Sequence, residues 1–294
     1  MAISATYQPN APAAKTGQGS AISNREDLSN ELAILAPEET PILSLCSKGK
    51  ASATYTEWTV DSLAAPVTTG ISEGSDVTSF SDKFADRARL GNYIQVMRRD
   101  YLVSNLQQAV TSIGPANIAQ AEAKSMRELK RDIEATIASS NEMTVENGAG
   151  TPYGMRGIGA WVQSTAQGTN PVPAAYRTPS GSILATTVTE TTFNGMIGSI
   201  FSRNGEMNSL TLVANTALRQ VISGFTRAQP ASAGVTYHVN QDATSKAITL
   251  SVNLYDSDFG MVKIVNGNPS CMPTASTNVG YVINPKYLGF NTLI

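Results

Sequence analysis

The chain alternates between stretches of helical and of strand-like apolar spacing. The longest helical stretch lies within residues 114–141, where apolar positions share one face at spacings of eight, three, four and four. These positions are Ile118, Met126, Leu129, Ile133 and Ile137. Pro115 suits the first turn of such a helix. Most other positions from 122 to 134 are charged, so we expect a long helix with a narrow apolar stripe.

Three shorter stretches also predict helices. Residues 24–45 place Leu28, Leu32 and Leu35 on one face. Asn24 is a suitable N-cap for this helix, and Pro37 is a suitable stop. Residues 190–204 share a face made of Phe193, Met196, Ile197, Ile200 and Phe201. A third predicted helix follows residues 209–215 and has on one face Leu218, Val221, Ile222 and Phe225.

Strand-like composition surrounds one long polar stretch. Residues 52–63 and 88–104 are rich in aromatic and β-branched residues and predict strands. Between them, residues 64–82 are polar and include Gly70 and Gly74, with no helical or strand period. We therefore expect two long antiparallel strands joined by a flexible loop.

Three later segments also predict strands. Residues 209–215 form a short buried run. Residues 247–265 predict a hairpin that turns at residues 256–260, and residues 279–290 predict a last strand. In the first half of that hairpin, we expect one face to hold Ile248, Leu250, Val252 and Leu254.

Composition narrows the class of protein. The chain has 294 residues, 15% of them charged, and a net charge of −2. This charge disfavours tight nucleic-acid binding and lets identical copies crowd together. Residues 1–23 carry one charged side chain, Lys15, and too little apolar surface to fold alone. We expect a flexible arm there.

The cysteines and the N-terminus indicate the compartment. Cys46 and Cys271 lie far apart and form neither a disulfide framework nor a zinc signature. The first twenty residues lack the basic and apolar regions of a signal peptide. No apolar run is long enough to span a membrane. We therefore expect an intracellular, reducing compartment, with both thiols reduced and partly buried.

One short motif raises the question of catalysis. Residues 70–74, GISEG, fit the G-x-S-x-G pattern of a serine nucleophile on a strand-to-helix turn. The flanking sequences LAAPVTTG and SDVTSFSDKF suit neither the strand nor the helix that this turn requires. The single histidine, His238, has no obvious partner. We therefore interpret the motif as a flexible loop tip that contains Gly70, Ser72, Glu73 and Gly74.

Other catalytic and metal motifs are missing from the sequence. One histidine and two scattered cysteines exclude most zinc sites. Neither a P-loop nor a dinucleotide fingerprint occurs. The DFG tripeptide at residues 258–260 lacks the other kinase motifs and is interpreted as a hairpin turn. We expect no enzymatic activity, no cofactor and no metal site.

The order of the parts resembles the major capsid (major head) proteins of tailed bacteriophages. It runs from a flexible arm through a long hairpin and a long charged helix to an α+β domain and a closing strand. Several stretches are similar to one branch of this family: REDLSNELAILAPEETPILSL, ATYTEWTVDSLAAP, ISEGSD, RLGNYIQVMRRDYLVS, AEAKSMRELKRDIEATI and LYDSDFGMVKIV. The resemblance covers most of residues 24–265.

The resemblance implies an α+β chain with the tailed-phage major capsid fold. We expect an N-terminal arm over residues 1–50 and an extended loop, built as a long β-hairpin, over residues 51–104. A peripheral domain with the spine helix would cover residues 105–150. An axial domain would follow over residues 151–270, and residues 271–294 would return as a strand to the peripheral domain.

The resemblance also implies a function and partners. The chain would be a structural subunit of an icosahedral phage head, forming hexamers and pentamers that enclose double-stranded DNA without sequence-specific binding. It would be made in the bacterial host cytoplasm and reside in the virion capsid, away from membranes. Its partners would be copies of itself, a separate scaffold, a portal and, where present, a decoration protein. A tail tube, an encapsulating compartment and an enzyme using Ser72 and His238 are the alternatives.

Charged side chains on the hairpin and the spine helix are the candidate contacts between subunits. Ion pairs fix register and orientation more than affinity, and small contacts add up around closed rings. The hairpin candidates are Glu57, Trp58, Arg87, Arg89, Arg98 and Arg99. The helix candidates are Lys124, Arg127, Glu128, Lys130 and Arg131.

Overall fold

The computed structural model describes residues 36–110, 117–168, 170–184, 187–204, 209–225, 252–273 and 278–293. The chain divides into two compact units, one of residues 1–36 and 100–125 and one of residues 37–99 and 126–294. The expected helix face with Leu28, Leu32 and Leu35 lies outside the described residues, as do Ile248, Leu250 and His238.

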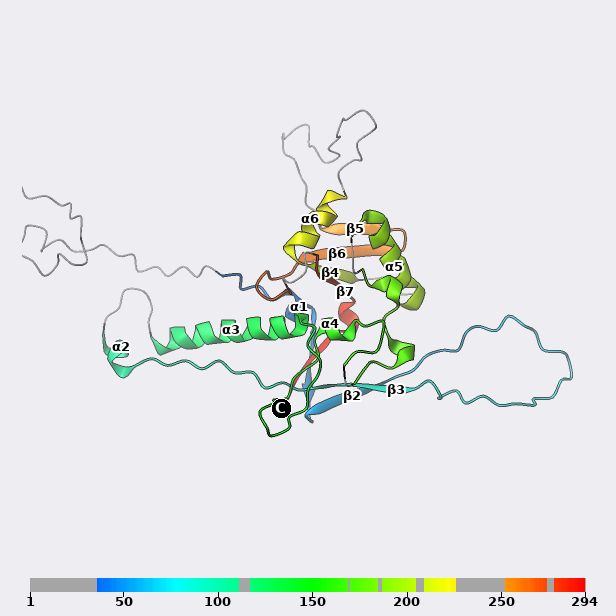
Figure 1. Cartoon of the computed structure of the whole chain (residues 1–294), viewed down its shortest axis with the longest axis horizontal. Helices are drawn as coiled ribbons and strands as arrows, with labels where there is room; N and C mark the ends of the chain where they lie inside the picture. Colours follow the sequence, from blue (N-terminus) through cyan, green and yellow to red (C-terminus); the bar gives the residue numbers. More distant parts are fainter. Residues whose placement is uncertain are drawn as a thin grey trace, which may run out of the picture. The chain divides into compact units, whose positions relative to one another are not determined.

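Helices and strands are mixed along the chain, as an α+β fold requires (Figure 1). The helices are α1 (Pro41–Leu45), α2 (Asn105–Ala109), α3 (Ile118–Ala138), α4 (Ile158–Trp161), α5 (Glu190–Asn204) and α6 (Thr216–Gly224). The strands are β1 (Ser47–Ala51), β2 (Tyr55–Val60), β3 (Ala88–Tyr93), β4 (Leu210–Ala214), β5 (Leu254–Ser257), β6 (Gly260–Asn266), β7 (Gly280–Ile283) and β8 (Gly289–Leu293). Short 3₁₀ turns are η2 (Ala174–Tyr176), η3 (Ser180–Ser182) and η4 (Pro285–Tyr287).

A four-stranded sheet in the order β5-β6-β4-β7 forms the main core. β4 runs parallel to β6 and antiparallel to β7, and β5 runs antiparallel to β6. α5 and α6 cover one face, burying Phe193, Ile197, Leu218 and Ile222 against the sheet. The helices predicted for these segments are confirmed. The exception is Phe201, predicted on the buried face, which is exposed and stacks on Phe259 instead.

A second apolar cluster lies on the other face of β4. It joins Ile42 of α1, Ile137 of α3 and Val213 of β4. Only the C-terminal end of the α3 stripe is buried here, since Ile137 is 6% exposed whereas Met126 is 55% exposed. The stripe predicted for this helix is therefore only partly a core face.

The long helix lies within the predicted stretch and begins behind an asparagine cap. α3 starts at Ile118, and the Asn117 side chain accepts the backbone N–H of Gln120 as an N-cap. An asparagine in this role satisfies one of the unpaired N–H groups of the first turn, which fixes the start of the helix. Pro115, expected in the first turn, lies outside the described residues.

The hairpin is shorter than predicted. β2 and β3 pair from Tyr55 with Tyr93 to Val60 with Ala88. The predicted strand over residues 88–104 ends at Tyr93, after which one more hydrogen bond joins the N–H of Ile94 to the carbonyl of Thr54 over 2.9 Å. α2 then begins behind Ser104, whose hydroxyl accepts the N–H of Gln107.

The hairpin turn predicted within residues 256–260 is confirmed, although two details near the C-terminus differ from the prediction. β5 continues to Ser257 and β6 begins at Gly260, so Asp258 and Phe259 form the turn. Leu254 is exposed and Tyr255 packs on the core instead. The single strand predicted over residues 279–290 is two strands: β7 pairs with β4, and β8 pairs in parallel with β1. Pro285 and the short turn it begins separate them.

Candidate inter-subunit surfaces

The loop between β2 and β3, residues 61–87, exposes apolar side chains along its whole length. Their exposed fractions range from 61% at Phe84 to 99% at Leu63. The set is Leu63, Val67, Ile71, Val77, Phe80 and Phe84. Figure 1 shows this segment as a long extended loop that projects beyond the paired strands. A segment with this many exposed large apolar side chains favours contact with another surface.

The neck of this loop is closed by polar contacts. The Arg87 guanidinium donates to the Asp61 carboxylate over 2.8 Å, next to the last pair of the hairpin. That hydrogen bond holds the pKa of Asp61 below its usual value. The Tyr176 hydroxyl donates to the carbonyl of Asp86 over 2.6 Å. The neck is therefore fixed, although the loop beyond it is exposed.

The GISEG segment forms a turn in the middle of this loop. The N–H of Ser75 donates to the carbonyl of Ser72 over 3.2 Å, and Gly74 adopts a φ of +75° that favours glycine. β2 ends at Val60 and β3 begins at Ala88, so neither a strand nor a helix flanks Ser72. The strand-to-helix geometry of a serine nucleophile is not present here.

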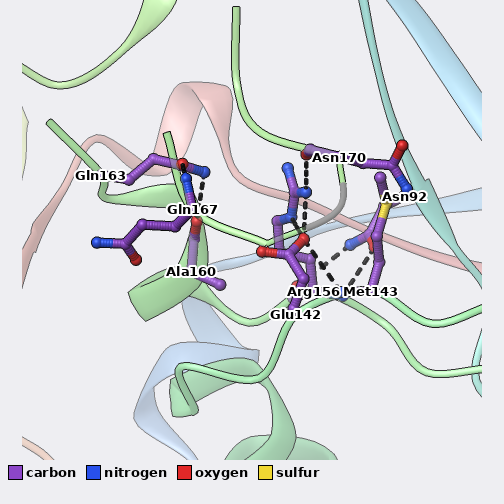
Figure 2. A network of polar contacts seen from close by, with 8 residues as sticks. All are labelled: Asn92, Glu142, Met143, Arg156, Ala160, Gln163, Gln167 and Asn170. Atoms are coloured by element: carbon purple, nitrogen blue, oxygen red, sulfur yellow. Dashed lines mark hydrogen bonds and ion pairs between the residues drawn. The ribbon is translucent and has the colours of Figure 1, made fainter. Parts of the chain in front are cut away.

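The base of the hairpin is tied to residues 142–170 by a buried polar network, shown in Figure 2. The Asn92 side chain on β3 accepts the N–H of Arg156 over 2.8 Å and donates to its carbonyl over 3.2 Å. The Arg156 guanidinium pairs with Glu142, with Nε to Oε1 at 2.6 Å, and also donates to the carbonyl of Asn170. Sequence reasoning did not identify this network, because its members are scattered along the chain.

Four of the predicted arginines form ion pairs within one subunit. On the hairpin, Arg87 pairs with Asp61 and Arg89 lies 3.9 Å from Glu57. Arg99 binds both carboxylate oxygens of Asp132 on α3, at 2.5 and 2.7 Å. Arg127 of α3 pairs with Glu38 over 3.2 Å. These pairs are partly exposed, so each contributes at most about 1 kcal/mol to subunit stability.

The other candidates differ in exposure. Arg98, Lys124 and Lys130 are exposed, whereas Glu128 and Arg131 are half-buried. Trp58 on β2 is 45% exposed and packs against Trp161, with ring centroids 5.6 Å apart. Contact of any of these side chains with a second subunit stays a prediction.

Two structural findings bear on metals and membranes. Among the residues that the structure describes, no three histidine, cysteine or acidic side chains group closely enough to hold a metal ion. Within the same ranges, no helix is both long and apolar enough to cross a bilayer. Cys46 and Cys271 are buried free thiols, and burial raises the pKa of Cys46 to about 11.

The comparisons with known proteins agree with this architecture. The family model of the SU10 major capsid protein matches residues 13–294. No curated protein matches. The capsid structure of the cyanophage P-SCSP1u is similar at a TM-score of 0.50 and 14% identity, over 95% of this chain and 84% of that one. The capsid of a native GTA particle is similar at a TM-score of 0.52 and 12% identity, over 91% and 80%.

The hairpin with its exposed apolar loop, the charged helix and the α+β core agree with a subunit of a phage head shell, the class that the family match shows. The chain belongs to the SU10 major capsid protein family. The likeness to the solved capsids confirms the predicted tailed-phage major capsid fold. Its role is structural, and its place is the virion capsid.

Proposed function

We propose that this subunit assembles into hexamers and pentamers of an icosahedral head, with the extended loop of each subunit lying on a neighbouring one. One observation carries the proposal: the apolar side chains of residues 61–87 have little cover within their own subunit. Burying one phenylalanine such as Phe80, which is 92% exposed, is worth roughly 1.5–3 kcal/mol. Repeated around a closed ring, such contacts add up.

Charge favours a particular receiving surface. The loop carries more acidic than basic residues; its charged side chains are Asp61, Glu73, Asp76, Asp82, Lys83, Asp86 and Arg87. The exposed side of α3 presents Arg127 and Lys130 beside Met126, and the segment after β3 presents Val96, which is 85% exposed. We propose that the loop binds this mixed basic and apolar surface of the next subunit, because complementary charges fix the register of the contact.

The finer organisation is proposed on the resemblance to tailed-phage heads. It divides the chain into an arm (1–50), an extended loop (51–104), a peripheral domain (105–150), an axial domain (151–270) and a return strand (271–294). The net charge of −2 supports a shell that encloses double-stranded DNA without binding it tightly. A strongly basic inner wall would contact many phosphates, and each contact would add salt-dependent affinity. A separate scaffold, a portal and synthesis in the host cytoplasm belong to the same proposal.

Negative-stain electron microscopy with parallel light scattering tests this assembly. The purified protein, alone or with a scaffold protein supplied, should form uniform closed particles with five-fold and six-fold clusters. Open-ended tubes would point to a tail-like polymer instead. A monodisperse monomer or dimer under both conditions would contradict the proposal.

A further inference from the structure

Residues 153–159, here called the bridging segment, connect the base of the hairpin to the end of α3. On the hairpin side, the N–H of Met155 donates to the Gln95 side chain over 3.2 Å, and Tyr93 stacks on Tyr153 at 5.8 Å. On the helix side, the N–H of Gly157 donates to the carbonyl of Asn141 over 3.1 Å. The segment therefore contacts the end of β3 and is also hydrogen-bonded to the residues that follow α3.

The backbone of the bridging segment is joined to β3 by side chains rather than by a ladder. The Asn92 amide satisfies both the N–H and the carbonyl of Arg156, as a neighbouring strand would (Figure 2). Two hydrogen bonds from one planar amide restrict the rotation of the segment about β3 more than either could alone. The direction of the hairpin relative to α3 thus depends on where the backbone of Arg156 is held.

The Arg156 side chain holds that backbone in place. The residue is only 4% exposed, and its guanidinium reaches Glu142, the carbonyl of Asn170 and the ring of Trp161, 4.6 Å from the centroid. Trp161 in turn packs on Trp58 of β2. Arg156 is therefore linked to both strands of the hairpin, to β3 through Asn92 and to β2 through Trp161 and Trp58.

We propose that Arg156 is the positioning residue of the extended loop: it sets the direction in which the hairpin leaves the subunit. A lysine could pair with Glu142, but it lacks the planar fork that also reaches a carbonyl and stacks on an indole. This inference rests on the proposed function for its consequence, because a misdirected loop would miss the neighbouring subunit. The direction itself is a property of one subunit and is measured there.

Spin labels on cysteines introduced by Thr59→Cys on β2 and Lys263→Cys on β6 report the hairpin direction. Both positions are exposed, whereas Cys46 and Cys271 are buried thiols that label poorly in the folded protein. Labelled subunits diluted into unlabelled ones give intramolecular distances in either assembly state. Arg156→Gln is the test variant and Arg156→Lys the conservative one. Arg177→Gln is the matched control, since Arg177 donates to the carbonyl of Val172 in the same region.

We expect one narrow distance distribution in the parent protein and in the Arg177→Gln variant. Arg156→Gln should shift and broaden it, and Arg156→Lys should do so to a smaller extent. If Arg156→Gln fails to fold, the same distance distribution is measured in Asn92→Ala. This variant removes the two hydrogen bonds between the hairpin and the backbone of Arg156. Unchanged distributions in the test variants that fold would overturn the proposal. A changed distribution with normal particles would uphold the positioning role and contradict the loop contact between subunits.

Discussion

The carboxylate of Glu134, near the C-terminal end of α3, accepts the backbone N–H of Ile42 at the start of α1 over 2.8 Å. Its second oxygen accepts the N–H of Leu43, also at 2.8 Å. Thr40, the residue before α1, makes no side-chain cap. A helix start needs such acceptors because its first N–H groups have no partner within the helix. A buried side chain from a distant helix therefore caps α1 and fixes it to the core.

Replacing Glu134 should destabilise the subunit. Glu134→Ala leaves the buried N–H of Ile42 without its acceptor, and an unsatisfied buried donor costs about 1–3 kcal/mol. Glu134→Gln keeps one acceptor oxygen and should cost less. Urea unfolding of the three proteins checks the order. Equal stability of all three would show that the cap contributes nothing.

The pH dependence of the Glu134 effect has a defined sign. Burial raises the pKa of Glu134 above its ordinary value of 4.5, and the hydrogen bonds from Ile42 and Leu43 offset only part of this. Between the pKa of Glu134 in the unfolded chain and its higher pKa in the folded protein, the folded protein retains a proton that the unfolded chain has released. The contribution of Glu134 to the free energy of unfolding therefore falls as the pH rises between these two values. The advantage of the parent over Glu134→Gln should shrink from pH 4.5 upwards and then level off. An advantage that grows with pH would contradict this.

The apolar side chains of the extended loop should matter for assembly and not for folding. Phe80→Asp should abolish or strongly reduce particles while leaving the melting temperature of the subunit unchanged, because Phe80 is 92% exposed. Thr69→Asp adds the same charge to an exposed polar position of the loop and serves as the control. Light scattering measures the yield. Equal yields for both variants would show that the added charge, or nothing, matters there.

The pair of Arg99 and Asp132 should behave as a contact within one subunit. Arg99→Asp should lower stability by at most about 1 kcal/mol, less in high salt, because the pair is partly exposed. Adding Asp132→Arg should restore both stability and assembly. A double variant that folds normally but still fails to assemble would instead place Arg99 at a contact between subunits, as the sequence predicts.

Charge reversal at neighbouring basic residues of α3 should impair assembly where the residue is exposed and folding where it is half-buried. Lys130→Glu and Arg127→Glu reverse exposed charges, so they should reduce particle yield with little change in unfolding free energy. Arg131→Glu should unfold the subunit more readily, since Arg131 is half-buried and its side chain lies beside the buried Cys271 thiol. Similar melting curves for all three variants would contradict this division.

Periodicity predicted the elements whose partners are close in sequence or whose faces are fully buried. α5 and β4 were predicted with nearly their observed bounds, and α6 was predicted from apolar positions that include its buried Leu218 and Ile222. All three elements contribute buried side chains to the main core. The hairpin of β2 and β3 followed from residue type and from the polar stretch between them. The capsid fold, now confirmed, was predicted from the resemblance of this order and of several stretches to tailed-phage major capsid proteins.

What sequence reasoning missed depends on contacts between distant residues. The parallel pairing of β1 with β8 joins strands some 240 residues apart, with Ser47 opposite Gly289, and no local pattern indicates it. In the sequence, Glu134 is one of many charged residues of a helix with a narrow apolar stripe, yet its exposed fraction is 1%. Arg156 lies in a glycine-rich stretch without period, so only the fold shows its role.

A cryo-electron microscopy reconstruction of the assembled particle would show where the extended loop lies. Residues 61–87 of each subunit should lie on α3 of a neighbour, with Ile71 and Phe80 buried there. Asp82 or Asp86 should lie near Arg127 or Lys130 of that neighbour. A particle in which this loop stays in solvent, or folds back on its own subunit, would contradict the proposed contact between subunits.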